Sequence, residues 1–248
     1  WRTEIRKDSK MKTNSNSYTI IYSAVLVIIV AFLLAFVFQA LKPAQDANVA
    51  LDQQKQILYA LNQDRGMSDA EAAQKYKELI VADDIIDANG NVVTKGTQGG
   101  TKAGFKLNSQ DAKNGKLALY RCKVDGKDKY VIPVYGTGLW GPISGYIAIN
   151  EDKATVFGAY FNHESETAGL GAEIKDNAQW QAQFKGKHLF ANDPSKIALS
   201  VVKKGTVKNP DYEVDGVTGA TLTSNGVSAM LKADKGGLQP YVKFLSQK

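Results

Sequence analysis

The chain has 248 residues, a net charge of +6, one cysteine and two histidines. The single Cys122 excludes an intramolecular disulfide and a multi-cysteine zinc or iron–sulfur site, and His163 and His188 have no partner at the spacing of a metal site or a catalytic triad. The lysines are scattered without interleaved arginines and aromatics, so the positive charge does not indicate nucleic-acid binding.

An uncharged, apolar run from Tyr18 to Leu41 is the first recognisable element. As a helix it is about 36 Å long, enough to cross a hydrocarbon core of about 30 Å. A cleaved signal peptide is the alternative, but its apolar core is normally shorter, about 7–15 residues. We therefore predict one transmembrane helix over residues 18–41.

The charges around this run predict its orientation. The segment before it, residues 1–17, carries five basic side chains against two acidic ones. The positive-inside rule makes this segment a cytoplasmic tail and puts residues 42–248 across the membrane. Met11 is a candidate start residue, and if residues 1–10 are an extension, the orientation depends on Lys12 alone.

Two helices are expected after the membrane segment. Residues 44–62 have an imperfect apolar stripe at helical spacing, and Ser68 with Glu71 forms a capping box that opens a second helix ending near Leu79. Polar residues on their other faces suggest a stalk or cap outside the core. The glycine-rich stretch from 96 to 104 that follows is expected to be mobile.

From residue 116 onward the pattern is mainly that of β-structure. Two alternating runs flank Asp125-Gly126, which is a hairpin signal. The expected strands are Lys116–Val124, Lys127–Tyr135, Gly145–Asn150, Ala154–Asn162 and Ile197–Val202, and the expected helices are Asp176–Phe184 and Ser224–Lys232. We predict an α+β fold: a single N-terminal transmembrane helix followed by one domain with a curved, mainly antiparallel sheet and packed helices.

One motif is rejected. The run Gly136-Thr137-Gly138-Leu139-Trp140-Gly141 matches the dinucleotide-binding fingerprint and follows a strand. That fold needs a helix to begin there, so that its first amides meet the pyrophosphate. Pro142 and a β-type run follow instead, so we predict no Rossmann site.

The run from Asp215 to Thr221 near the C-terminus is the most informative segment. Its last threonine stands at the end of a turn of small residues, just before the helix expected from Ser224, with Thr223 or Ser224 as N-cap. Gly219 and Ala220 allow close backbone approach, and a helix N-terminus attracts anions. The run suits a phosphate beside a hydroxyl, although a plain capping loop has the same pattern.

This run resembles the flavinylation motif Asp-x-x-(Ser/Thr)-Gly-Ala-Thr, in which the last threonine carries FMN through a phosphoester bond. Two further segments resemble the same flavin-binding family: Glu166 to Gly171, and Gly138 to Pro142 leading into Gly145 to Ala148. The family often has proline where Ala168 stands, a difference in backbone stiffness. The resemblance implies covalent FMN on Thr221.

With the apolar anchor ahead of these motifs, the chain from Met11 to Lys248 resembles the family of C subunits of Na+-translocating NADH:quinone oxidoreductases. This implies a single-pass protein of the bacterial inner membrane with a periplasmic domain, whose partners are the other subunits and a flavin transferase. The flavoprotein subunit of the Rnf-type ferredoxin:NAD+ complex is the nearest alternative, disfavoured by the two early helices. A membrane-anchored binding domain without redox chemistry is the other.

The resemblance also implies which residues contact the flavin. Leu139, Trp140 and Leu170 would form an apolar wall for the ring; an ordinary core aromatic is the alternative for Trp140. Glu166 would hydrogen-bond the ribityl chain or ring edge, or be a solvated loop carboxylate, and Asp215 would serve the flavin transferase, or only set a turn. The complete predicted set is Leu139, Trp140, Gly141, Glu166, Thr167, Gly169, Leu170, Gly171, Asp215, Thr218, Gly219, Ala220, Thr221 and Thr223.

No segment suits a nicotinamide site, a catalytic triad or a metal cluster. The resemblance then implies an electron carrier that passes electrons between redox centres of neighbouring subunits, while NADH oxidation, quinone reduction and Na+ passage occur elsewhere. No catalytic residue and no metal ligand are assigned.

Overall fold

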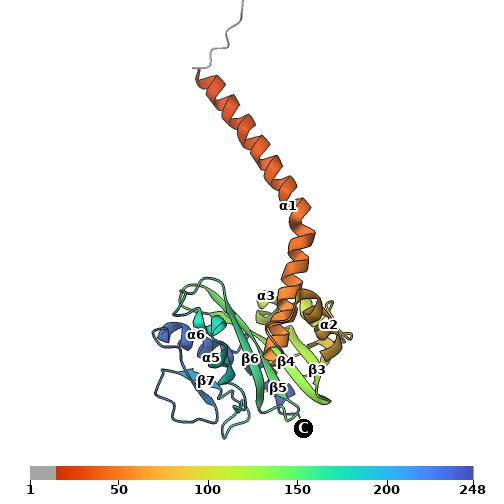
Figure 1. Ribbon diagram of the computed structural model, residues 1–248, viewed down its shortest axis with the longest axis vertical. Coiled ribbons are helices and arrows are strands. Elements are labelled where there is room, and N and C mark those ends of the chain that lie inside the picture. Colours follow the sequence, from red (N-terminus) through yellow and green to blue (C-terminus); the bar gives the residue numbers. More distant parts are fainter. Residues whose placement is uncertain (1–14, 248) are drawn as a thin grey trace, which may run out of the picture. The chain divides into compact units, whose positions relative to one another are not determined.

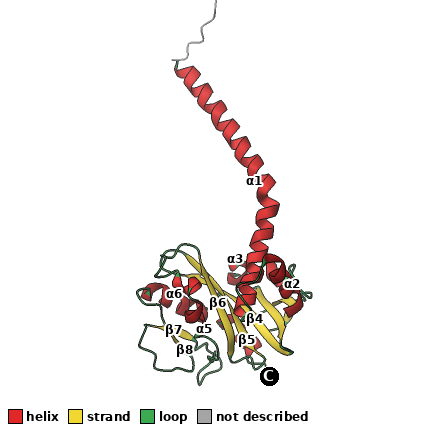
Figure 2. Ribbon diagram, in the orientation of Figure 1, coloured by secondary structure: helices red, strands yellow, loops and turns green. Residues whose placement is uncertain are grey.

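The computed structural model describes residues 15–247, and the chain divides into two compact units, Trp1–Ala50 and Leu51–Lys248. Figures 1 and 2 show the long first helix, the sheet and the short helices around it. The basic residues ahead of the apolar run, including Lys12, and the candidate start residue Met11 lie outside the described residues.

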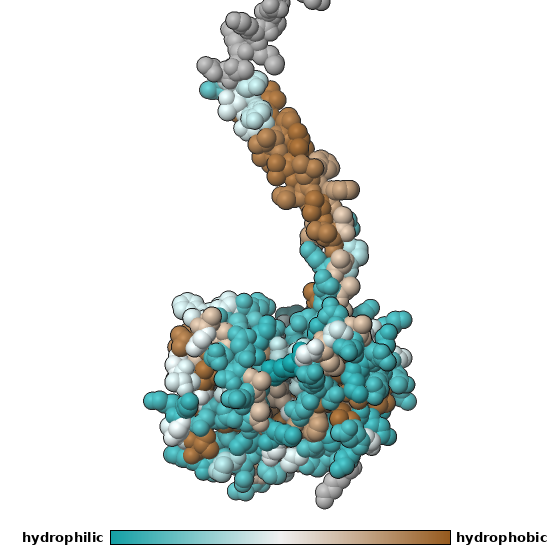
Figure 3. All heavy atoms as spheres, in the orientation of Figure 1, coloured by the Kyte–Doolittle hydropathy of each residue, from teal (hydrophilic) through white to brown (hydrophobic). Residues whose placement is uncertain are grey.

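Helix α1 spans Asn16–Ala60 and carries the predicted membrane segment. No described side chain between residues 15 and 49 is buried, and Figure 3 shows the apolar band along this helix. By length and composition α1 is able to cross a membrane, a test that a signal sequence near an N-terminus also passes. The separate helix predicted over residues 44–62 is instead the continuation of α1. Pro43 removes one hydrogen bond without ending the helix, because good helix formers stand on both sides.

The second unit is built on a six-stranded antiparallel sheet with strand order β2-β1-β3-β4-β5-β6. Its strands are β1 (Ile80–Ile86), β2 (Val92–Thr94), β3 (Leu117–Val124), β4 (Lys127–Thr137), β5 (Pro142–Asn150) and β6 (Val156–His163). The predicted hairpin is confirmed: Asp125 and Gly126 both adopt the positive φ that this turn needs. The α+β fold with one antiparallel sheet is confirmed as well, whereas strands β1 and β2 were not predicted.

The two faces of the sheet are covered by different helices. One face packs against the C-terminal part of the chain and forms the main core, which includes Ile132, Ile147, Phe161, Trp180 and Leu231. The remaining helical elements are α2 (Asp69–Leu79), η1 (Gly104–Lys106), α3 (Ser109–Lys113), α4 (Glu173–Asp176), α5 (Ala178–Ala182), α6 (Thr221–Lys232), η2 (Gln239–Tyr241) and α7 (Val242–Leu245).

The opposite face is covered by the end of α1 and by α2, so these helices are not a stalk or cap outside the core as predicted. Ile57, Leu58 and Tyr76 are fully buried, and Gln53 Nε2 donates to the Tyr120 hydroxyl at 3.3 Å. The buried residues of α1 all lie between Gln56 and Ala60, so only the end of the predicted apolar stripe faces the core. The capping box of α2 at Ser68 is confirmed.

Two buried aspartates of β1 hold the glycine-rich stretch that was predicted to be mobile. The Asp83 carboxylate accepts hydrogen bonds from the amides of Thr97, Lys102, Ala103 and Phe105. The neighbouring Asp84 accepts one from Gly96 and pairs with Arg121 at 2.5 Å. These bonds satisfy both buried carboxylates and fix the stretch against the sheet edge.

The part of the chain that carries the C-terminal motif contains a second, two-stranded sheet. Strands β7 (Ser200–Val202) and β8 (Glu213–Asp215) pair in parallel. The strand predicted from Ile197 is therefore shorter at its start, where Ile197 forms only an isolated bridge to Phe190. The helix predicted over 176–184 is instead two short helices, α4 and α5, because Asn177 stops the first and caps the second.

The rejection of the dinucleotide fingerprint is confirmed. Its residues form the end of β4 and the turn into β5, and no helix begins there. Cys122 is buried in β3, and burial raises the pKa of its thiol, which disfavours the reactive thiolate.

Candidate functional site

The three segments singled out in the sequence meet at one end of the second unit. They are the turn between β4 and β5, the loop that follows β6, and the connection from β8 to α6. Figure 1 shows α6 beside the sheet, and α6 contacts β4 and β7. The carboxylate of Glu166 joins the three segments.

Glu166 is a buried carboxylate, 7% exposed, with both oxygens occupied. Oε1 accepts a hydrogen bond from the Trp140 amide at 2.8 Å, and Oε2 accepts one from the Thr223 hydroxyl at 2.6 Å. The Glu166 amide donates to His163 Nδ1 at 3.2 Å. The carboxylate therefore connects the β4–β5 turn, its own loop and the first turn of α6, rather than standing in solvent.

Two glycines make room for this carboxylate. A Cβ on Gly138 would overlap Glu166 Oε1, and a Cβ on Gly171 would overlap Glu166 Oε2 and lie 2.7 Å from Thr223 Oγ1. Neither glycine has a positive φ. They are required for close approach and not for backbone conformation.

Helix α6 begins at Thr221, three residues earlier than predicted, and its N-cap residue Ala220 makes no side-chain capping bond. Thr223 and Ser224 are not the cap, because their hydroxyls are used elsewhere. Thr223 donates to Glu166, and Ser224 Oγ accepts from the Val217 amide at 3.0 Å, which ties the motif back onto the helix. The first-turn amides of α6 have no intrahelical acceptor.

Thr221 is thus the first residue of α6, and its side chain is exposed. The turn before it requires a glycine: Gly219 has φ +76°, and a Cβ there would lie 2.8 Å from Leu170 Cδ2. Thr218 is exposed as well. The Thr221 hydroxyl therefore lies beside an uncapped helix N-terminus, a position that favours a phosphate.

Four large apolar side chains are exposed around this hydroxyl-bearing turn. Trp140 is 66% exposed, Leu222 60%, Leu139 48% and Leu170 43%. Exposure this high excludes the core-aromatic alternative for Trp140. Leu222 was not predicted. The sequence holds no signal that separates it from an ordinary core-facing apolar residue beside a helix start.

Asp215 ends β8, beside a polar cleft. Its Oδ1 accepts from the Gly205 amide at 2.7 Å, and its carbonyl accepts from Trp180 Nε1 at 2.7 Å. The cleft has a volume of about 390 Å3 and is lined by Gly169, Glu173, Asn177, Gln179, Trp180, Gln183, Lys204, Asp215, Gly216, Val217 and Thr218. Lys204 and Trp180 were missed in the sequence, since neither stands in a motif.

The other predicted residues are backbone elements of the same turns. The Thr167 carbonyl accepts from the amides of Leu170 and Ala172, Gly169 takes φ +71°, and the Gly141 carbonyl accepts from the Gly138 amide at 2.8 Å. In the described part of the chain, no group of three or more His, Cys, Asp or Glu side chains is arranged to hold a metal ion.

Comparisons with known proteins agree with this geometry. Residues 138–233 match the FMN-binding domain family. The chain is 32% identical to the C subunit of the Na(+)-translocating NADH-quinone reductase of Haemophilus ducreyi, covering 94% of this chain and 96% of that protein. It is 37% identical to the corresponding protein of Vibrio vulnificus over 75% of this chain and 78% of that one. The crystal structure of the C subunit from Parabacteroides distasonis superposes with a TM-score of 0.74 at 36% identity, covering 84% of this chain and 98% of that chain. At this identity and coverage, the chain belongs to the family of C subunits of Na+-translocating NADH-quinone reductases.

Proposed function

We propose that this protein is the membrane-anchored flavoprotein subunit of a Na+-translocating NADH-quinone reductase, carrying FMN on Thr221 through a phosphoester bond and passing electrons between neighbouring subunits. The observation that carries the proposal is the convergence of three motif segments on an exposed threonine at an uncapped helix N-terminus. The match of residues 138–233 to the FMN-binding domain family supports it.

The residues present fit such a cofactor. The first-turn amides of α6 and its dipole would stabilise a phosphate joined to the Thr221 oxygen. Formation of that ester replaces the O–H bond of Thr221 with an O–P bond, and the group displaced from phosphorus leaves with the hydroxyl proton. Exposed Leu139, Trp140, Leu170 and Leu222 provide apolar surface for the ring. When bound, FMN supplies the electron-accepting and electron-donating chemistry.

The remaining predicted residues are given roles by their contacts. Glu166 and Thr223 position the Trp140 loop and the start of α6, since their polar atoms bond to each other and to the Trp140 amide. The polar cleft beside Asp215 and Thr218, with the cation of Lys204, suits the polar parts of the cofactor. Asp215 also stands where a flavin transferase would approach the motif.

Intact mass tests the proposal directly. Protein co-expressed with a flavin transferase is expected to gain the mass of an FMN group less water, located by peptide mapping on Thr221. A protein of unmodified mass that also lacks flavin absorbance would instead indicate a non-redox binding domain.

We expect Trp140→Ala to change the flavin's surroundings without removing it. The side chain is 66% exposed, so unfolding free energy should change by less than about 0.5 kcal/mol, while flavin fluorescence rises through loss of a stacking partner. Gly169→Val should disturb the flavin spectrum more, because φ +71° is strained for a β-branched residue. Loss of folding in Trp140→Ala without a flavin effect would contradict the assignment.

We also propose that residues 18–41 cross the bacterial inner membrane, with residues 1–17 cytoplasmic and residues 42–248 periplasmic. The apolar part of α1 and the charge asymmetry around it support this topology. Protease added to sealed spheroplasts should digest the region after Leu41 and leave the N-terminal tail protected. Digestion of the tail with protection of the flavin domain would show the reverse orientation.

A further inference from the structure

A second cleft, remote in sequence from the flavin motifs, is lined by two cations and no carboxylate. It has a volume of about 200 Å3 and lies between the end of α1, strand β6 and helix α5, which stand side by side in the second unit. Among the described residues that line it, Arg65 and Lys185 are charged, and there is no Asp or Glu. The charges that line it therefore favour an anion, while Asp52 and Asp176, the carboxylates that act on neighbouring Tyr160, lie outside the lining.

Arg65 is held in place on three sides. Its guanidinium carbon lies 5.5 Å from the ring centroid of Tyr59 and 5.5 Å from that of Tyr160, and Nη2 donates to Gln181 Oε1. Gln181 is itself buried and donates to the carbonyls of Ile174 and Lys175. Burial raises the pKa of Tyr160 to about 12, so this phenol does not neutralise the arginine. The side chain is ordered before any ligand arrives, which lowers the entropy cost of binding.

Lys185 supplies the second cation from beyond the end of α5. Its side chain is exposed, and it forms no ion pair with a described carboxylate. Small residues also line the cleft: Gly158, Ala159, Ala178 and Ala182. Ala178 and Ala182 are exposed on α5, so no long side chain from these two positions covers the cleft.

The size of the cleft limits what can occupy it. About 200 Å3 is below the roughly 300–1,000 Å3 of small-molecule sites, but it accommodates one acidic side chain. We propose that this cleft, referred to below as the Arg65–Lys185 cleft, receives an Asp or Glu side chain of a neighbouring subunit and so docks the domain in its complex. This inference rests on the proposed function, because it requires the multi-subunit assembly.

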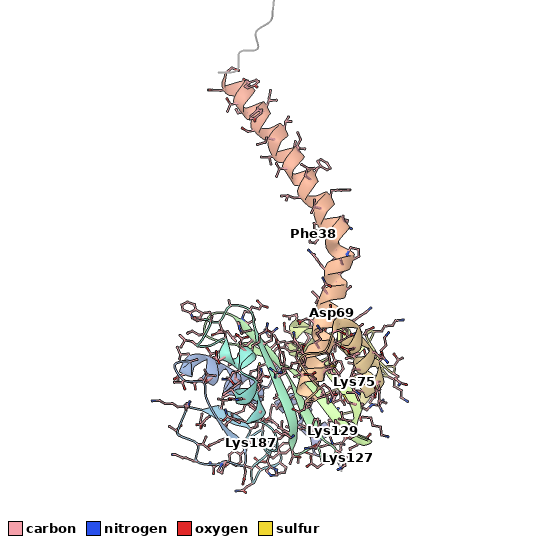
Figure 4. The ribbon with its side chains drawn as sticks, viewed as in Figure 1. Phe38, Asp69, Lys75, Lys127, Lys129 and Lys187 are labelled. Carbon is pink, nitrogen blue, oxygen red and sulfur yellow. The ribbon has the colours of Figure 1, made fainter. Side chains whose placement is uncertain are left out.

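Charge reversal of Lys185 tests the docking. Lys185→Glu is made in the complete complex, which is purified through a tag on another subunit, and the variant chain is quantified in the eluate. We expect at least about tenfold less of this chain to be retained, because a like charge then faces the incoming carboxylate. The matched control is Lys127→Glu, the same charge change at the β3–β4 hairpin, whose position Figure 4 marks; it should be retained as in the wild type.

Arg65→Gln should also weaken retention, and thermal melting of the isolated chain shows whether that variant stays folded. In-gel flavin fluorescence separates the two proposals. A variant chain that carries its full flavin but is not retained in the complex would test the docking proposal alone, whereas a wild-type chain without flavin would refute the flavin assignment. A carbodiimide joins a lysine amine to a contacting carboxylate as an amide, and it should link Lys185 to an acidic residue of another subunit. Normal retention of Lys185→Glu, or cross-links of Lys185 only within its own chain, would overturn the docking proposal.

Discussion

Thr221→Ala should abolish covalent flavin and leave the domain folded. The hydroxyl is the proposed attachment atom, and no other described group forms a hydrogen bond with it. Alanine is a better helix former than threonine at this exposed position of α6, so the unfolding free energy should change by less than about 0.5 kcal/mol. Fluorescence on a denaturing gel and intact mass measure the flavin, and thermal melting measures the fold.

The neighbouring threonines are the controls. Thr218→Ala removes an exposed hydroxyl and should keep at least part of the label. Thr223→Ala removes the bond to Glu166, so it should lower the unfolding free energy by about 1–3 kcal/mol, yet it should also keep at least part of the label. Fluorescent flavin on denatured Thr221→Ala would refute the assignment, whichever threonine carried it.

Glu166→Ala should be the most destabilising substitution at the site. It leaves the buried Thr223 hydroxyl and the Trp140 amide without their acceptor, and it opens a cavity. We expect a loss of about 3 kcal/mol in unfolding free energy. The flavin absorbance bands should also broaden, because the loop of Trp140 and the start of α6 lose the carboxylate that holds both of them. Denaturant unfolding and visible absorbance measure the two effects.

Glu166→Gln separates positioning from direct flavin contact. Its carbonyl oxygen accepts from the Trp140 amide, and its NH2 group donates to Thr223 Oγ1, so only about 1 kcal/mol should be lost. If Glu166 acts by position, the flavin spectrum of this variant stays near that of the wild type. A large spectral change without destabilisation would show that the carboxylate charge acts on the flavin itself. Gly171→Ala should resemble Glu166→Ala, because its Cβ overlaps the same carboxylate.

The elements with a regular period were predictable from the sequence, and those stabilised by distant partners were not. The β3–β4 hairpin was found because its alternation and its Asp-Gly turn are both local. Strand β1 was missed because Asp83 and Asp84 lie in its middle, where carboxylates are unfavourable unless buried bonds satisfy them. Here the amides come from a loop about 20 residues away along the chain.

At the site the same distinction holds. A motif was sufficient to single out Thr221 and Gly219, whose properties depend on their own turn. The partners of Glu166 lie 26 and 57 residues away, and no local pattern indicates that one carboxylate connects three segments. The helix start was also misplaced, since the Thr223 hydroxyl donates to distant Glu166 and the Ser224 hydroxyl accepts from Val217 in the preceding turn, and neither caps the helix.

The fixed conformation of the segment that bears Thr221 has a consequence for when the proposed modification can take place. Ser224 Oγ accepts from the Val217 amide within the acceptor segment, and Trp180 of α5 donates to the Asp215 carbonyl at the end of β8, a bond that requires α5 and β8 to have packed together. The threonine itself remains at the surface of the folded domain. If a flavin transferase modifies Thr221 as proposed, the acceptor turn that it meets in the folded domain already has its final conformation, so folding can precede cofactor attachment.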